Sequence, residues 1–259
     1  MANIPELQAL PRVEAARYVL PLREGGSMPG LVEDGEGRLW VAKLHGAGQG
    51  PGVLVAELVA GELARALGFA VPTIALLELP PRFGASEGDP EVQDLLAASV
   101  GLNVGLGFLS GAVAYDPSGR WPIHGDLAAR LVAFDVALSN VDRTHRNPNL
   151  LWAREQLWLI DHGAALYWQH GWDGRLPERE PALPRLHEHV ALPLARDLPA
   201  AARALSAALR PELLRAALAL VPAEWLAAGG VDPEQRRAAL VQRLIRRAER
   251  LPELLEGPR

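Results

Sequence analysis

The sequence predicts an α+β fold with two lobes, in which a sheet lobe is followed by a mostly helical lobe. Roughly the first hundred residues contain short apolar runs separated by Gly-rich turns, a pattern typical of strands. Beyond Pro181 the chain is rich in Ala and Leu with breaks at Pro and Gly, which is typical of short helices. The 259 residues, nearly half of them apolar, suffice for one two-lobed unit with a substantial core. We expect the lobes to span residues 1–109 and 110–259.

The N-terminal lobe is predicted to be an antiparallel sheet with one helix. Five strands are expected, at residues 13–22, 29–34, 38–44, 71–79 and 103–109. The helix is expected over residues 53–68, because this run has helix-forming residues and ends in Gly68, which suits the position after a helix. Residues 80–102 carry Pro, Gly and acidic residues and are expected to form an excursion between the last two strands.

In the C-terminal lobe, Asp126 is expected to cap a helix. Its apolar face has near-helical spacing and comprises Leu127, Leu131, Phe134 and Leu138. A hairpin should follow, with strands LLW at 150–152 and LWLI at 157–160 and a turn at Arg154-Glu155. Asp232-Pro233 predicts the start of the last helix, since Asp is a good cap and Pro a good first residue.

Composition excludes several classes of site and partner. The chain has no cysteine, which rules out disulfides, thiolate zinc sites and a Cys nucleophile. A net charge of −5 argues against broad attraction to nucleic acid or anionic lipid, so neither nucleic acid nor membrane is an expected partner. The start MANIPELQAL lacks the pattern of a signal peptide, and no apolar run reaches the roughly 18 residues of a spanning helix. A cytoplasmic protein is therefore expected.

Two segments carry the chemistry, NVDRTHRNPNLL at 140–151 and LIDHGAAL at 159–166. The predicted hairpin brings Asn147 and Asp161 to one end of two strands that lie only about 5 Å apart. A carboxylate and an amide oxygen suit Mg²⁺, which keeps several waters, so these two residues are the predicted metal ligands. Asp142, on the loop that leaves the helix, could orient an attacking hydroxyl or accept its proton. This order of groups is typical of phosphoryl transfer.

The first lobe offers groups that could bind ATP. Lys43 ends the strand LWVAK, in the position of a lysine that reaches the α- and β-phosphates. Glu57, on the following helix, is favoured over Glu62 as its partner, because it shares a face with Gly61, where the helix can approach the sheet closely. A Gly-rich turn with Gly26, Ser27 and Gly30 could cover phosphates with backbone N–H groups, and Leu109 at the lobe junction would contact the nucleotide.

Lys43, Glu57, Asp142, Asn147 and Asp161 resemble, in order and spacing, the residues of the HipA-like kinases, which are distant relatives of the phosphatidylinositol 3/4-kinases. The resemblance covers roughly residues 13–172. Its most specific parts are the two segments above and AELVAGELARALGFAVP at 56–72.

This resemblance implies a protein-kinase-like fold that uses ATP and Mg²⁺ to transfer the γ-phosphoryl group to a hydroxyl acceptor, with a protein Ser or Thr as the implied acceptor. By the same resemblance Lys43 contacts phosphate, Glu57 pairs with Lys43, Asp142 is catalytic, and Asn147 and Asp161 bind the metal.

The chain also departs from common kinase motifs. No His-Arg pair precedes Asp142, His162 stands where Asp-Phe-Gly has Phe, and no Ala-Pro-Glu follows. A nucleotide-binding pseudokinase or scaffold therefore stays open as an alternative, as does a kinase acting on a small molecule or lipid headgroup. The acceptor, an antitoxin partner and autophosphorylation at Ser27 are also open.

Other polar clusters have simpler interpretations. His187 and His189 flank Glu188 but have no evident third ligand, so we expect a surface segment and no metal site. Arginines stud the last helix, and because glutamates offset them we expect a solvated face.

Overall fold

The structure is a computed structural model that describes residues 7–22, 29–47, 50–119, 121, 123–171 and 177–256. Its strands are β1 (Arg12–Pro21), β2 (Gly30–Asp34), β3 (Leu39–Lys43), β4 (Ile74–Leu79), β5 (Gly101–Gly107), β6 (Val113–Ala114), β7 (Leu150–Ala153) and β8 (Gln156–Leu159). Its α-helices are α1 (Gly52–Ala66), α2 (Pro90–Ala98), α3 (Gly125–Leu138), α4 (Leu198–Ala208), α5 (Pro211–Ala219), α6 (Ala223–Leu226), α7 (Pro233–Glu249) and α8 (Leu251–Glu256). The predicted α+β class is confirmed.

The strands β1 to β5 form a closed barrel in the order β1-β2-β3-β5-β4. Strand β1 starts parallel to β4, where Arg12 pairs with Leu76, and continues antiparallel to β2. Two register shifts in β1, between Ala15 and Arg17 and between Tyr18 and Leu20, bend this ten-residue strand. Such irregularities let a sheet curve and close. The prediction of a purely antiparallel sheet is therefore wrong at this one pairing.

A second helix, α2, lies between β4 and β5, so the prediction of one helix in this part is also wrong. The carboxylate of Asp89 accepts a hydrogen bond from the Glu91 backbone N–H at 3.0 Å, and Pro90 occupies the first turn. Within the segment predicted to form an excursion, the Asp89-Pro90 pair is thus a helix start. Val92 and Leu96 of α2 pack into the cluster of buried residues inside the barrel.

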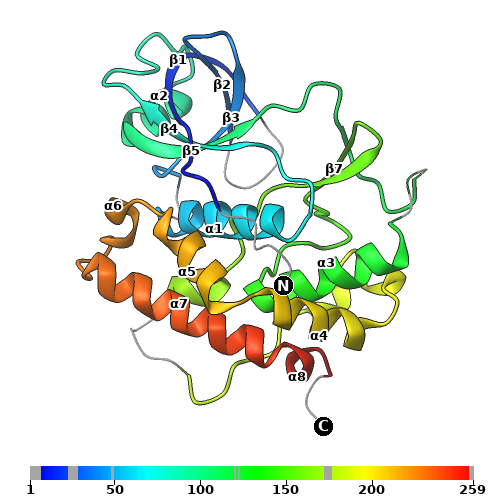
Figure 1. The fold of residues 1–259 in the computed structure, drawn as a ribbon. Coiled ribbons are helices and arrows are strands. Elements are labelled where there is room, and N and C mark those ends of the chain that lie inside the picture. The colour runs from blue at the N-terminus through cyan, green and yellow to red at the C-terminus, as the bar shows by residue number, and fades with distance from the viewer. Residues whose placement is uncertain are drawn as a thin grey trace.

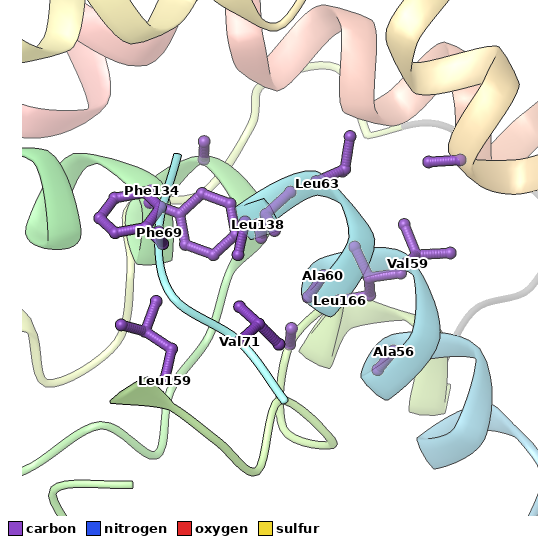
Figure 2. Packing of buried hydrophobic residues seen from close by; sticks show 14 of the residues in the cluster. Ala56, Val59, Ala60, Leu63, Phe69, Val71, Phe134, Leu138, Leu159 and Leu166 are labelled. Atoms are coloured by element: carbon purple, nitrogen blue, oxygen red, sulfur yellow. The ribbon is translucent and has the colours of Figure 1, made fainter. Parts of the chain in front are cut away.

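Helix α1 lies between the barrel and the helices at the other end of the molecule (Figure 1). Its side chains are buried over most of its length, and Ala56, Ala60 and Leu63 belong to the main core together with residues of α3. Figure 2 shows this packing, in which the ring of Phe69, just after α1, lies 5.3 Å from that of Phe134.

The close approach predicted at Gly61 is confirmed. A Cβ atom at this position would lie 2.4 Å from Ile74 Cδ1, so a larger residue would require the Ile74 side chain to shift.

The hairpin β7–β8 forms as predicted, with Leu150 opposite Leu159 and the turn at Arg154 and Glu155. Both turn residues have positive φ, 51° and 59°, as tight two-residue hairpin turns require. The preceding helix α3 begins at Gly125 after His124, so Asp126 lies in its first turn and is not the cap that we predicted. There its charge favours the helix N-terminus.

The last long helix, α7, starts as predicted, because Asp232 accepts a hydrogen bond from the Gln235 N–H at 2.8 Å. Its arginines do not all face solvent, however. Arg243 and Arg247 are buried and each contacts Glu180, which corrects the expectation of a solvated face. In the described ranges, no helix is both long and apolar enough to cross a membrane.

The β2–β3 turn depends on one buried carboxylate, and we expect Asp34→Ala to lower the free energy of unfolding by about 2–4 kcal/mol. Asp34 accepts hydrogen bonds from the Glu36 and Arg38 N–H groups, both at 2.9 Å, and from Trp40 Nε1 at 2.9 Å. These bonds outweigh burial and lower the pKa of Asp34. Chemical denaturation measures the effect, and the exposed Glu36→Ala should change stability by less than about 1 kcal/mol. Equal effects of the two substitutions would contradict this role.

Candidate active site

Lys43, at the end of β3, is buried and forms an ion pair with the residue that follows the hairpin. Its Nζ lies 2.6 Å from Asp161 Oδ1, and only 6% of its side chain is exposed. Burial acts to lower the pKa of Lys43, but the negative charges of Glu57, Asp161 and Asp142 outweigh it and raise the pKa. Lys43 therefore stays charged, and three of the predicted acidic residues act on it.

Lys43 is also the only lysine in the sequence, which uses arginine at the other 25 of its 26 cationic positions. Lysine differs from arginine in presenting a compact ammonium as a point charge, and Lys43 is the one position where this chain does so.

Glu57 faces this ion pair from α1 and is fully buried. Its Oε1 lies 3.5 Å from His162 Nδ1, too long for a good hydrogen bond, and neither carboxylate oxygen has a hydrogen-bond partner among the residues that the structure describes. Burial acts to raise the pKa of Glu57, whereas the contact with His162 and the charge of Lys43 lower it, and the net shift is downward. The ion pair of Lys43 thus forms with Asp161, and Glu57 acts on Lys43 through its charge.

Asp142 lies on the loop after α3 and is held by two asparagines. Its Oδ2 accepts hydrogen bonds from Asn147 Nδ2 at 2.7 Å and from Asn149 Nδ2 at 3.4 Å. Asn149 was not among the predicted residues, although its place just before β7 and its positive φ of 50° mark a constrained position. Asp161 also has a positive φ, 53°, which is uncommon outside glycine and occurs often at functional sites.

The donor atoms fit the predicted magnesium site. Because Asn147 uses its amide nitrogen for Asp142, its Oδ1 has no partner among the described residues and can act as a ligand. Asp161 keeps 29% of its side chain exposed beside Lys43. In the part of the chain that is described, no group of three or more His, Cys, Asp or Glu could hold a metal, so a magnesium site here would need Asp161, Asn147 and further oxygens from a bound nucleotide.

A cavity of about 730 Å³ opens beside Lys43 and Asp161. Its walls are mostly apolar and come from the barrel, from the chain after β5, and from the hairpin. They include Val41, Leu106, Phe108, Leu109, Leu151 and Ile160. An apolar cavity with few charged groups at one end is the usual form of a small-molecule site.

Of the predicted Gly-rich turn, Gly30 belongs to the described residues. Gly26 and Ser27 lie outside the described residues. Leu22 and Pro29, which flank residues 23–28, do line the cavity. Gly30 lies in β2, where an added Cβ would contact the Tyr18 ring at 2.7 Å, and it is not a wall residue.

His187 and His189 have different environments. His187 is exposed as predicted, but His189 is buried, with Nε2 3.0 Å from Asp135 Oδ2. The surface interpretation of His189 is therefore wrong. Its partner lies 54 residues earlier in the chain, and no local pattern indicates it.

Comparisons with known proteins show the family and the fold of the chain. The HipA-like kinase family matches residues 18–250 of the chain. Among solved structures, the fold is similar to that of the Helicobacter pylori proinflammatory kinase CtkA, with a TM-score of 0.59 and 12% identity, over 96% of this chain and 100% of that chain. No curated protein matches. Since the family match spans most of the sequence, the chain belongs to the HipA-like kinase family.

Proposed function

We propose that this protein is a Mg²⁺- and ATP-dependent kinase that transfers the γ-phosphoryl group to a hydroxyl acceptor, a protein Ser or Thr. The observation that carries the proposal is the ion pair of the single lysine with Asp161 at the wall of the cavity, where the charges of Glu57 and Asp142 also act on Lys43. In this proposal residues 1–109 and 110–259 act as two lobes and the nucleotide binds between them. Membership of the kinase family supports the reaction class.

The walls of the cavity and the polar residues beside them each have a role in this proposal. The apolar walls, which include Val41 and Leu106 of the barrel and Leu151 and Ile160 of the hairpin segment, suit the flat faces of an adenine ring. Lys43 is charged and buried, so it can bind phosphate oxygens as a point charge. Magnesium, when bound, neutralises charge that builds up on the phosphates. Asp161 and the Oδ1 of Asn147 would hold it.

Asp142 would orient the acceptor hydroxyl and take up its proton. Asn147 and Asn149 both donate to Oδ2, so Oδ1 is the oxygen left to accept a hydrogen bond from the acceptor. A general base needs to be within hydrogen-bond reach of the hydroxyl, and a carboxylate fixed by two amides meets this condition with little reorganisation.

A pseudokinase is the second candidate, and one observation favours it. The Lys43–Asp161 ion pair, 2.6 Å long, engages an oxygen of the carboxylate that a metal would need. A protein locked in this pair could bind nucleotide without transferring phosphate. Turnover of ATP that depends on Asp142 would exclude it.

Calorimetry with ATP tests the nucleotide site, using Lys43→Arg and Lys43→Ala. We expect wild type to bind ATP in the presence of Mg²⁺ and both variants to bind about 10- to 100-fold more weakly, because a charge-assisted hydrogen bond contributes about 1.5–3 kcal/mol. Arginine at position 43 should not restore ATP binding, since the buried site accommodates a compact ammonium.

The matched control is Arg215→Lys, which changes the same pair of residue types on the exposed side of α5 and should leave ATP binding unchanged. Wild-type protein that fails to bind ATP with Mg²⁺, or a Lys43→Ala variant that binds equally well, would overturn the proposed nucleotide site.

A further inference from the structure

The loop that carries Asp142 lacks a preceding His-Arg pair, and a buried cluster outside the proposed reaction holds it instead. Asp135, near the end of α3, is the centre of this cluster and has no exposed surface. Its Oδ2 accepts hydrogen bonds from Arg143 Nε at 2.6 Å and from His189 Nε2 at 3.0 Å, and its Oδ1 accepts one from Asn140 Nδ2 at 2.9 Å. Three donors therefore fix both oxygens of one buried carboxylate.

Two routes lead from Asp135 to Asp142. In the first, Asn140 donates to Asp135 and its Oδ1 accepts a long hydrogen bond from the Asp142 N–H at 3.3 Å. In the second, Arg143 Nη1 donates to the Asn149 carbonyl at 2.6 Å, and the amide of Asn149 reaches the Asp142 carboxylate. The cluster thus acts on both the backbone and the side chain of Asp142.

His189 attaches a third part of the chain to the same loop. Its Nδ1 accepts a hydrogen bond from the Ala191 N–H at 3.1 Å while Nε2 faces Asp135, an arrangement that the neutral ring with its proton on Nε2 satisfies. Two backbone hydrogen bonds also join these segments. The Val190 N–H donates to the Arg143 carbonyl at 3.1 Å, and the His145 N–H donates to the Glu188 carbonyl at 3.2 Å.

We propose that Asp135, Arg143 and His189 are positioning residues that set the carboxylate of Asp142 for the phosphoryl-transfer step. The proposal rests on the proposed kinase function. The charge on Asp135 is secure, because Arg143 and His189 outweigh the effect of burial and lower its pKa to about 2. None of the three residues lines the cavity, so their effect should appear in turnover and not in nucleotide affinity.

Hydrogen exchange in the nucleotide-free protein tests the positioning independently of catalysis. In His189→Leu, which keeps bulk but removes both ring nitrogens, we expect the backbone amides of residues 143–147 and 149 to exchange about ten-fold faster than in wild type, with α1 and the barrel unchanged. His189→Gln, which can both donate and accept, should restore most of the protection. His187→Leu is the matched control, because His187 is 81% exposed, and it should show wild-type exchange.

Kinetics supply the second measurement. We expect His189→Leu and Arg143→Lys to lower kcat by about 100-fold with KM for ATP within about three-fold of wild type, because a misplaced catalytic group costs rate and not binding. Arg143→Lys keeps the charge beside Asp135 but cannot also bridge to the Asn149 carbonyl. If His189→Leu does not fold, the Arg143→Lys variant alone tests whether the cluster positions Asp142.

Unchanged loop exchange in these variants, or faster exchange with wild-type kcat, overturns the proposal. A wild-type protein that transfers no phosphate refutes the kinase function instead, and the exchange measurement then still decides whether the cluster holds the loop.

Discussion

Replacement of Asp161 by Asn is expected to lower the rate of phosphoryl transfer by about a thousand-fold or more. The change keeps the shape of the side chain but removes the charge that Mg²⁺ requires, and metal stabilisation of the transferring group contributes several kcal/mol. It also removes the negative charge beside Lys43 Nζ, which lies 2.6 Å from Asp161 Oδ1 in the wild type. Lys43 should remain charged in the variant, because the charges of Glu57 and Asp142 still act on it.

Initial rates measured over a Mg²⁺ titration check this expectation. Wild type should saturate with Mg²⁺, and Asp161→Asn should not recover even at high concentration. Asp94→Asn makes the same chemical change on an exposed position of α2 and should behave like wild type. An Asp161→Asn variant with a normal rate and normal Mg²⁺ dependence would show that Asp161 is not a metal ligand.

Replacement of Arg247 by Ala should lower the free energy of unfolding by about 3–5 kcal/mol, the usual cost of removing one partner of a buried ion pair. The guanidinium of Arg247 is fully buried and lies 3.2 Å from Glu180 Oε2. It also donates to the carbonyl oxygens of Val136 and Ala137, at 2.6 and 3.0 Å, which are near the C-terminal end of α3. Those carbonyls and the helix dipole both favour a cation there.

Chemical denaturation measures this effect, with Arg215→Ala as the control. Arg215 is 60% exposed and contacts Glu212 only at 3.8 Å, so its loss should cost less than about 1 kcal/mol. Similar losses in the two variants would contradict a structural role for Arg247. Because α3 delivers the loop with Asp142, we also expect Arg247→Ala to lose activity at a lower temperature than wild type.

The parts of the site that sequence predicts are those set by local spacing. Asn147 and Asp161 flank a hairpin whose two-residue turn fixes the register, so their placement at one end follows from the pattern of residues 150–160. The strand ending in Lys43 and the helix with Glu57 and Gly61 are likewise adjacent in the chain.

Contacts between distant segments could not be predicted in the same way. The pairing of Lys43 with Asp161 joins residues more than a hundred positions apart, and His189 contacts Asp135 across 54 positions. A buried polar residue needs a partner, and the sequence shows the residue without showing the partner. Closure of the barrel depends on bends within β1, which no side-chain pattern marks. Helix α2 is different, because the Asp89-Pro90 signal was present in the sequence.

The most direct test of Mg²⁺-ATP-dependent transfer is incubation with ATP labelled on the γ-phosphate in the presence of cell extract, comparing wild type with Asp142→Asn. Wild type with Mg²⁺ should transfer label to protein Ser or Thr, and Asp142→Asn should do so about 10²- to 10⁴-fold more slowly, the range for loss of a general base. An absence of labelled acceptor with wild type, or equal labelling by Asp142→Asn, would contradict a kinase whose reaction depends on this carboxylate.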